Sequence, residues 1–230
     1  MSSFINRILR TLPILLIPII LILGSARLLA TDAYLALEYG KVSFPPDSYG
    51  FTQQQRFELA STNLHYSLAH LPSDTLANQT VDGKPVYSPR EATHMVDVQT
   101  AFQSVLRTWQ AAFILLLLIG FVLWRNGKRT ALASALQSGG ILTSGIILAI
   151  GLLALFAWQV WFDNFHLVFF EPGSWLFAYS DTLIRLFPLP FWVDATFTIT
   201  AFSLSGGLLL AFAGRRWQFV IKKTSRRKSL

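Results

Sequence analysis

The stretch "WQAAFILLLLIGFVLWRNGKRTALASALQSGGILTSGIILAIGLLALFAW", Trp109–Trp158, decides the fold of this chain. It holds two long apolar runs, and a helix of about 20 apolar residues is enough to cross a bilayer. The short segment "RNGKR" between them carries three basic side chains and no acidic one. The second run is rich in glycine and serine, which allow close helix packing in lipid. The stretch therefore predicts two transmembrane helices joined by a basic loop.

The rest of the chain has the same character. Of its 230 residues 53% are hydrophobic and 13% are charged, and the mean hydropathy is +0.47. Soluble domains carry about a quarter charged residues. Two further apolar stretches, 12–29 and 192–213, are long enough to span a bilayer. We therefore predict an all-α integral membrane protein with four transmembrane helices.

The expected order is a terminus 1–11, a span 12–29, an outer domain 30–108, a span 109–124, a loop 125–131, a span 132–161, an aromatic interfacial loop 162–191, a span 192–213 and a basic tail 214–230. The first span is expected to be uncleaved, because its apolar run exceeds the usual 7–15 residues of a signal peptide and no clean cleavage site follows.

Charge predicts the orientation. Twelve of the 19 basic residues lie in 1–11, 125–131 and 214–230, and all 12 acids and all four histidines lie elsewhere. The positive-inside rule places both termini and the basic loop in the cytoplasm. The outer domain and the aromatic loop then face the extracytoplasmic side. The tail is read as a topology signal that lies on anionic lipid, and we expect no nucleic-acid partner.

The outer domain is expected to be mostly helical. Thr52 with Gln55, and Ser88 with Glu91, have the spacing of capping boxes, and Pro89 suits a first helical position. No helix breaker separates Pro89 from the span 109–124. One long helix is therefore expected to leave the membrane. The segment between the two capped helices has the Pro, Asp and Gly content of a loop or a small hairpin.

That long helix would carry the first candidate site residue, His94. Asp97 follows three residues later, so both side chains share a helical face. A carboxylate beside an imidazole fixes its tautomer and raises its basicity, as a general base requires. The plain alternative is a solvated surface pair.

The second candidate is His166, within "FDNFHLVFFEPGSW", Phe162–Trp175, with Asp163 and Glu171 nearby. Burial among phenylalanines would favour the neutral imidazole, which can act as a base. The alternative is an imidazole that merely lies in an interfacial aromatic belt. Both histidines follow or precede neighbouring spans on the outer side. We therefore expect them to lie at the same leaflet, where they could shuttle a proton at an ester.

The outer aromatic residues are the candidate lipid contacts. Phe169, Phe170 and Trp175 would form either a plain belt or the wall of a groove for acyl chains. Arg185 is expected either to pair with Asp181 at i, i+4 or to meet a lipid phosphate.

Other chemistries have weaker support. The chain has no cysteine, which excludes a thiolate nucleophile and cysteine-ligated metal. No H-E-x-x-H, phosphate-binding glycine loop or G-x-S-x-G motif occurs. Metal ligation by His94, Asp97, His166 and Glu171 lacks any characteristic spacing. We expect neither a metal nor a cofactor.

Three quoted segments carry a resemblance: "FPPDSYGFTQQQRFELA" at 44–60, "EATHMVDVQ" at 91–99 and "FHLVFFEPGSWLFAYSDTLIRLFPLPFW" at 165–192. Together with the four spans, they resemble a family of bacterial integral membrane proteins that includes the lipoprotein intramolecular transacylase. The run "QQQRFE" departs from the family, in which more acidic residues would be expected.

The resemblance implies a bacterial cytoplasmic membrane enzyme whose substrate is a diacylglyceryl lipoprotein. The sn-2 acyl chain would pass to the α-amino group of the lipidated N-terminal cysteine. The family's two functional histidines would correspond to His94 and His166.

Such a reaction needs no nucleotide, because converting an ester into an amide is downhill, and no protein nucleophile, because the substrate amine attacks. Our hypothesis makes His94, oriented by Asp97, the base, while His166 donates to the leaving oxygen or stabilises the oxyanion; the two roles could be exchanged. The alternatives are a non-catalytic membrane scaffold and a metal-dependent lipid hydrolase.

Overall fold

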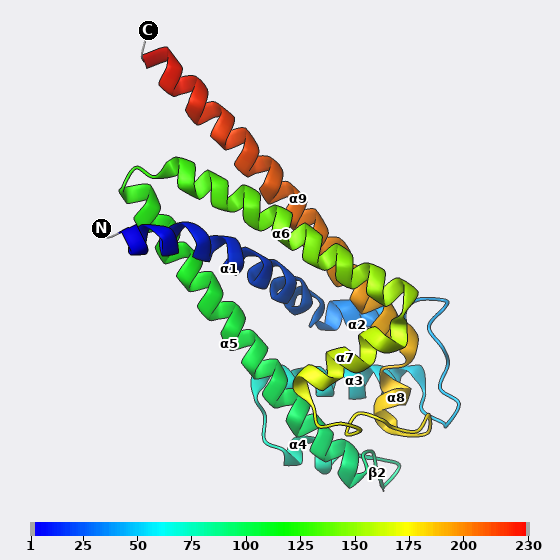
Figure 1. Cartoon of the computed structure of the whole chain (residues 1–230). Helices are drawn as coiled ribbons and strands as arrows, with labels where there is room; N and C mark the ends of the chain where they lie inside the picture. Colours follow the sequence, from blue (N-terminus) through cyan, green and yellow to red (C-terminus); the bar gives the residue numbers. More distant parts are fainter. Residues whose placement is uncertain (1–2, 229–230) are drawn as a thin grey trace. The chain divides into compact units, whose positions relative to one another are not determined.

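The computed structural model describes residues 3–228, which are helical along most of their length (Figure 1). In chain order the elements are α1 (Ser3–Leu29), α2 (Asp32–Tyr39), α3 (Gln53–Ala69), α4 (Asp74–Ala77), β1 (Thr80–Val81), β2 (Lys84–Pro85), α5 (Pro89–Arg125), α6 (Arg129–Phe156), α7 (Trp158–Phe169), α8 (Thr182–Leu186) and α9 (Leu189–Lys228). Four of them, α1, α5, α6 and α9, are long and apolar enough to cross a membrane. The prediction of a mostly helical protein with four membrane-length helices is confirmed.

The chain divides into two compact units. The first, called here the apolar unit, comprises Met1–Ala26, Arg107–Leu153 and Thr198–Leu230. The second, called the histidine unit, comprises Arg27–Leu106 and Ala154–Phe197 and contains all four histidines. The apolar unit contains no acidic residue, so every acid of the chain belongs to the histidine unit.

Close helix packing holds the apolar unit together. Leu16 of α1 packs with Ile119 and Leu123 of α5 in one buried cluster, and the Trp109 indole donates a hydrogen bond of 3.1 Å to the carbonyl of Ile20. Between α6 and α9 the backbones themselves approach, because a Cβ atom added at Gly140 would lie 2.4 Å from the carbonyl oxygen of Gly207. The glycine-rich stretch thus acts as small residues do in membrane helix interfaces.

This contact predicts that Gly140→Ala destabilises the protein by roughly 1–3 kcal/mol, the usual cost of overpacking, because the clash is with backbone that cannot rotate away. Gly145→Ala on the same helix is the matched control, since its added Cβ meets nothing within 4 Å. Thermal unfolding of the two purified variants in detergent measures the difference. Equal unfolding midpoints for the two variants would contradict this packing.

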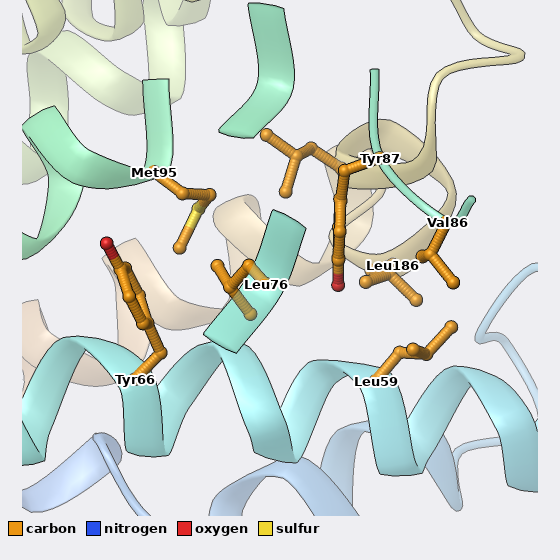
Figure 2. Close-up of a cluster of buried hydrophobic side chains, with 8 residues drawn as sticks. Leu59, Tyr66, Leu76, Val86, Tyr87, Met95 and Leu186 are labelled. Atoms are coloured by element: carbon orange, nitrogen blue, oxygen red, sulfur yellow. The ribbon is translucent and has the colours of Figure 1, made fainter. Parts of the chain in front are cut away.

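In the histidine unit a buried hydrophobic core joins several elements (Figure 2). Leu59 and Tyr66 of α3 pack with Leu76 of α4, Met95 of α5 and Leu186 of α8. All five side chains are less than 9% exposed. This core fixes the first turns of α5, and therefore the position of His94, against α3 and α8.

Both predicted capping boxes are present, and one of them does more than cap. Thr52 and Gln55 cap α3 reciprocally. Glu91 accepts hydrogen bonds of 2.9 Å from the backbone N–H and the hydroxyl of Ser88, while its other carboxylate oxygen accepts the N–H of Leu183, also at 2.9 Å. Glu91 is only 2% exposed, so this buried carboxylate ties the start of α5 to the start of α8.

Polar side chains of α5 also hold the end of α3. Gln99 donates hydrogen bonds of 2.8 and 2.9 Å to the carbonyls of Tyr66 and Leu71. These carbonyls lie at or beyond the last turn of α3, so Gln99 adds to the C-cap, in which the Tyr66 carbonyl also accepts the backbone N–H of His70. The expected hairpin is β1 paired antiparallel with β2, and the expected long helix is α5, which runs unbroken from Pro89 to Arg125 (Figure 1).

Two segments differ from the prediction. The region 162–191, expected to be a loop, contains the end of α7, all of α8 and the start of α9. Aromatic contacts at i, i+4 stabilise α7, with ring centroids 5.9 Å apart for Trp158–Phe162 and 5.4 Å for Phe165–Phe169.

The tail 214–230, predicted apart from the last span, continues α9 as one helix to Lys228, because no proline follows Ala213 (Figure 1). The ends of the predicted termini, 1–2 and 229–230, lie outside the described residues.

Candidate active site

His94 lies in the first turns of α5 and is only 9% exposed. Two aromatic rings cover its imidazole, with centroid distances of 5.0 Å to Phe170 and 5.3 Å to Phe177. The 37-residue helix α5 is far longer than the about 20 residues a bilayer requires. Its long apolar run, 109–124, begins 15 residues after His94.

His166 lies on α7 and is surrounded by rings. Its centroid is 4.1 Å from that of Phe162, 5.7 Å from that of Phe170 and 5.3 Å from that of Trp175, against which it stacks. Phe170 therefore contacts both histidines. We call these residues, Phe162, Phe170, Trp175 and Phe177 with His94 and His166, the aromatic cluster.

A backbone hydrogen bond fixes the tautomer of His166. Its Nδ1 lies 2.7 Å from the carbonyl oxygen of Phe162. A carbonyl can only accept, so Nδ1 carries the proton and the lone pair of the neutral ring is on Nε2. The sequence could not show this contact, which presents a proton-accepting nitrogen in a defined direction.

Burial keeps both imidazoles neutral near pH 7. Desolvation lowers the pKa of His94 to about 4; the charge of Asp97 opposes this shift, whereas those of His166 and Arg90 add to it. Desolvation also lowers the pKa of His166, although the Phe162 carbonyl and Asp163 act in the opposite direction. His94 is therefore neutral near pH 7.

The three acids expected to support the histidines do not contact them. Asp97 is exposed, and the buried Nδ1 of His94 has no hydrogen-bond partner within residues 3–228, so the predicted orienting hydrogen bond is wrong. Asp163 accepts instead from Gln159, at 2.9 Å on the same helix. The side chain of Glu171 is exposed. Spacing along a helix predicts which side chains share a face. It does not predict which hydrogen-bond partner a short side chain reaches.

The structure corrects the prediction for Arg185. Arg185 does not pair with Asp181 but forms a two-pronged ion pair with Asp47, at 2.8 and 2.9 Å, and its guanidinium lies 3.6 Å from the centroid of Phe51. Its side chain is 11% exposed, so it is not available for a lipid phosphate. Asp181 instead accepts the backbone N–H of Ala178 at 2.8 Å.

The Asp47–Arg185 pair predicts an acid-sensitive contribution to stability. Burial alone would raise the pKa of Asp47, but the hydrogen bonds from Arg185, Phe51 and Tyr49 outweigh it and lower the pKa to about 2. The unfolded value is about 3.9, so the pair stabilises the fold above that pH and loses its effect as pH falls toward 2.

We therefore expect Asp47→Asn to lower the unfolding midpoint at pH 6, and the difference from wild type to shrink by an amount on the order of 1 kcal/mol by pH 3. Thermal unfolding at both pH values measures it. Asp74→Asn, at an exposed position, is the control. A deficit of Asp47→Asn that stayed constant with pH would show that the pair does not behave in this way.

The remaining predicted site residues lie either in the aromatic cluster or at its edge. Phe170 and Trp175 contact the histidines directly, whereas Phe169 is 40% exposed and contacts Phe165 and Phe170. The four residues weighed as metal ligands are not gathered, because no group of three or more His, Asp or Glu side chains within the described residues could hold a metal ion.

Sequence reasoning missed three features of the site. Phe177 covers His94, and Arg90 donates to the backbone beside Trp175. The indole Nε1 of Trp175, with the hydroxyl of Ser174 beside it, is buried and has no hydrogen-bond partner among the described residues. The one sequence signal for these three features is the spacing of Arg90 and His94, which are four residues apart on one helix.

The chain matches known proteins along most of its length. The profile of the family described as lipoprotein intramolecular transacylase Lit matches residues 11–192. A protein of Aquifex aeolicus (strain VF5), described as uncharacterized, is 30% identical over 209 residues, which cover 87% of this chain and 90% of that protein.

Among solved structures, the in meso structure of the membrane integral lipoprotein intramolecular transacylase Lit from Bacillus cereus has a TM-score of 0.74 at 19% identity, covering 97% of this chain and all of that one. A second structure of that protein, with one histidine replaced by arginine, has a TM-score of 0.61 at 19% identity and covers 99% of this chain and 96% of the other. At these identities the structures show a shared fold.

Proposed function

Because this chain belongs to the lipoprotein intramolecular transacylase family, we propose that it moves the sn-2 acyl chain of a diacylglyceryl lipoprotein to the α-amino group of that lipoprotein's N-terminal cysteine. The observation that carries this proposal is the convergence of two neutral imidazoles, buried His94 and half-buried His166, on one aromatic cluster. The transacylase activity of the family requires proton transfer at an ester, and neutral imidazoles are suited to it.

The proposed setting follows from charge. With all acids confined to the histidine unit, we place that unit on the extracytoplasmic face of the bacterial cytoplasmic membrane and both termini in the cytoplasm. A diacylglyceryl lipoprotein then meets the site from the outer leaflet, with its acyl chains among membrane lipids and its amine near the surface.

The reaction balances within one substrate molecule. The lone pair of the cysteine amine attacks the sn-2 ester carbonyl carbon and forms a C–N bond. The tetrahedral intermediate then expels the glyceryl oxygen, so that the C–O bond breaks. One proton leaves the nitrogen and one is gained by the glyceryl oxygen. Holding amine and ester together can contribute several kcal/mol through proximity alone.

In this proposal His166 is the base. Its fixed Nδ1–H leaves the Nε2 lone pair to accept the proton of the attacking amine, and the Phe162 carbonyl raises the pKa of the ring and steadies the imidazolium. The same Nε2–H then returns the proton to the leaving glyceryl oxygen. The absence of an Asp97 hydrogen bond removes the reason for giving this role to His94.

His94 instead acts as a neutral hydrogen-bond donor. With a pKa of about 4 it is a weak base, yet as a neutral imidazole it keeps one N–H to offer to the ester carbonyl oxygen. The Trp175 indole N–H is a second donor beside the histidines. An unpaired buried donor costs free energy in the resting protein, and donating to the developing oxyanion satisfies it.

The test is fragmentation mass spectrometry of a defined diacylglyceryl lipopeptide after incubation with the purified protein. We expect conversion of the free-amine diacyl form into the N-acyl lyso form of equal mass. Release of free fatty acid would favour the hydrolase alternative. An unchanged lipopeptide, with folded protein, would contradict the proposal and favour a non-catalytic scaffold.

Glutamine substitutions separate the two histidine roles. A glutamine retains an N–H donor but cannot accept and return a proton, so we expect His166→Gln to lose on the order of 10²–10⁴ in kcat and His94→Gln to lose markedly less. His94→Ala should lose more than His94→Gln. The opposite ranking, with His166→Gln the more active, would exchange the roles.

Trp175→Phe tests the second donor, because phenylalanine keeps an aromatic ring against His166 but removes the indole N–H. We expect a loss on the order of 10² in kcat with a smaller change in KM, as for a donor that bonds mainly in the transition state. Trp161→Phe, on a ring of α7 that contacts Phe165 rather than the histidines, is the control. A wild-type kcat for Trp175→Phe would remove the indole from the mechanism.

A further inference from the structure

The loop that covers the histidines is held to α5 by one side chain. After α7, residues 171–179 carry Trp175, which stacks on His166, and Phe177, which covers His94. Arg90 donates hydrogen bonds from Nη2 to the carbonyl of Gly173 at 2.9 Å and to that of Leu176 at 2.7 Å. These two carbonyls flank the Ser174–Trp175 segment on both sides.

The same guanidinium also touches the loop's second aromatic residue. Its central carbon lies 4.9 Å from the centroid of Phe177, the ring whose own centroid is 5.3 Å from that of His94. A cation over an aromatic face is attractive. One arginine therefore holds two carbonyls and a ring, and through them the rings that contact both histidines.

The position of Arg90 on α5 directs these contacts to the site. Residues 90 and 94 are one helical turn apart and share a face. Arg90 therefore holds the loop against the helix face that carries His94. The two carbonyls that Arg90 binds lie 83 and 86 residues away from it in the chain. Arg90 forms no salt bridge with any carboxylate in residues 3–228, so its charge is directed to the loop.

We infer that Arg90 is a positioning residue for acyl transfer: it clamps the loop 171–179 so that Trp175 and Phe177 enclose the substrate ester against the two histidines. This inference rests on the proposed function. Arg90 need not touch the substrate, since it acts through the loop. Its side chain is exposed, so the clamp lies at the surface of the histidine unit.

The test compares Arg90→Gln and Arg90→Lys with a charge-matched control, Lys84→Gln, which removes a cation from an exposed position in β2. We expect Arg90→Gln to reduce kcat by about 10–100-fold with a smaller change in KM. Arg90→Lys, which keeps a charged donor, should recover part of that loss, and Lys84→Gln should match wild type. The unfolding midpoints of all three should stay close to wild type.

A second readout does not depend on activity. Hydrogen exchange of the backbone amides in 173–178 should accelerate in Arg90→Gln and not in Lys84→Gln. Faster exchange in Arg90→Gln, combined with a wild type that shows no transacylation, would support the clamp and contradict the proposed function. Wild-type kcat in Arg90→Gln, or a loss of kcat without faster exchange in this loop, would overturn the inference.

Discussion

The packing of two imidazoles among aromatic rings, with His94 buried and His166 half-buried, is the constraint on which the rest of the site depends. Desolvation disfavours the imidazolium form, so both rings are neutral at the pH at which the substrate amine is available to attack. A neutral imidazole can either accept a proton or donate one hydrogen bond. In the proposed mechanism the Phe162 carbonyl assigns the accepting role to His166, and the pKa of about 4 assigns the donating role to His94.

Keeping such a site assembled requires fixed supports, because aromatic contacts alone have little directionality. The supports are polar side chains whose partners lie far away in the sequence. Glu91 joins the starts of α5 and α8, Gln99 joins α5 to α3, and Arg90 joins α5 to the loop after α7. All three side chains belong to the first turns of α5. The membrane-length helix α5 is thus also the element on which the site is built.

Sequence predicted the features that depend on neighbouring residues. The caps at Thr52 and Ser88, the continuous helix α5 and the membrane-length helices all follow from local patterns. The choice of His94 and His166 as catalytic residues stays a prediction. Features chosen by tertiary contacts could not be predicted in this way. Arg185 pairs with Asp47, 138 residues away, rather than with its helical neighbour. Arg90 was missed because its partners are backbone carbonyls, which have no sequence signature.

The aromatic stretch around His166 shows the same limit. Its phenylalanines fit an interfacial belt as well as a helix, and only the ring contacts along α7 decide for the helix. The proposed exchange of roles between the histidines has a similar origin. Asp97 has the right spacing for an orienting partner, yet its side chain is exposed, and the orienting group in the structure is a backbone carbonyl behind the other histidine.

The most direct measurement is an experimental structure of the protein with an unreactive lipopeptide whose sn-2 ester is replaced by an amide and whose cysteine amine is free. The account predicts the amine within hydrogen-bond distance, about 2.6–3.2 Å, of Nε2 of His166, and the sn-2 carbonyl oxygen within reach of His94. A lipopeptide bound with its amine and sn-2 carbonyl away from these two histidines would contradict the account.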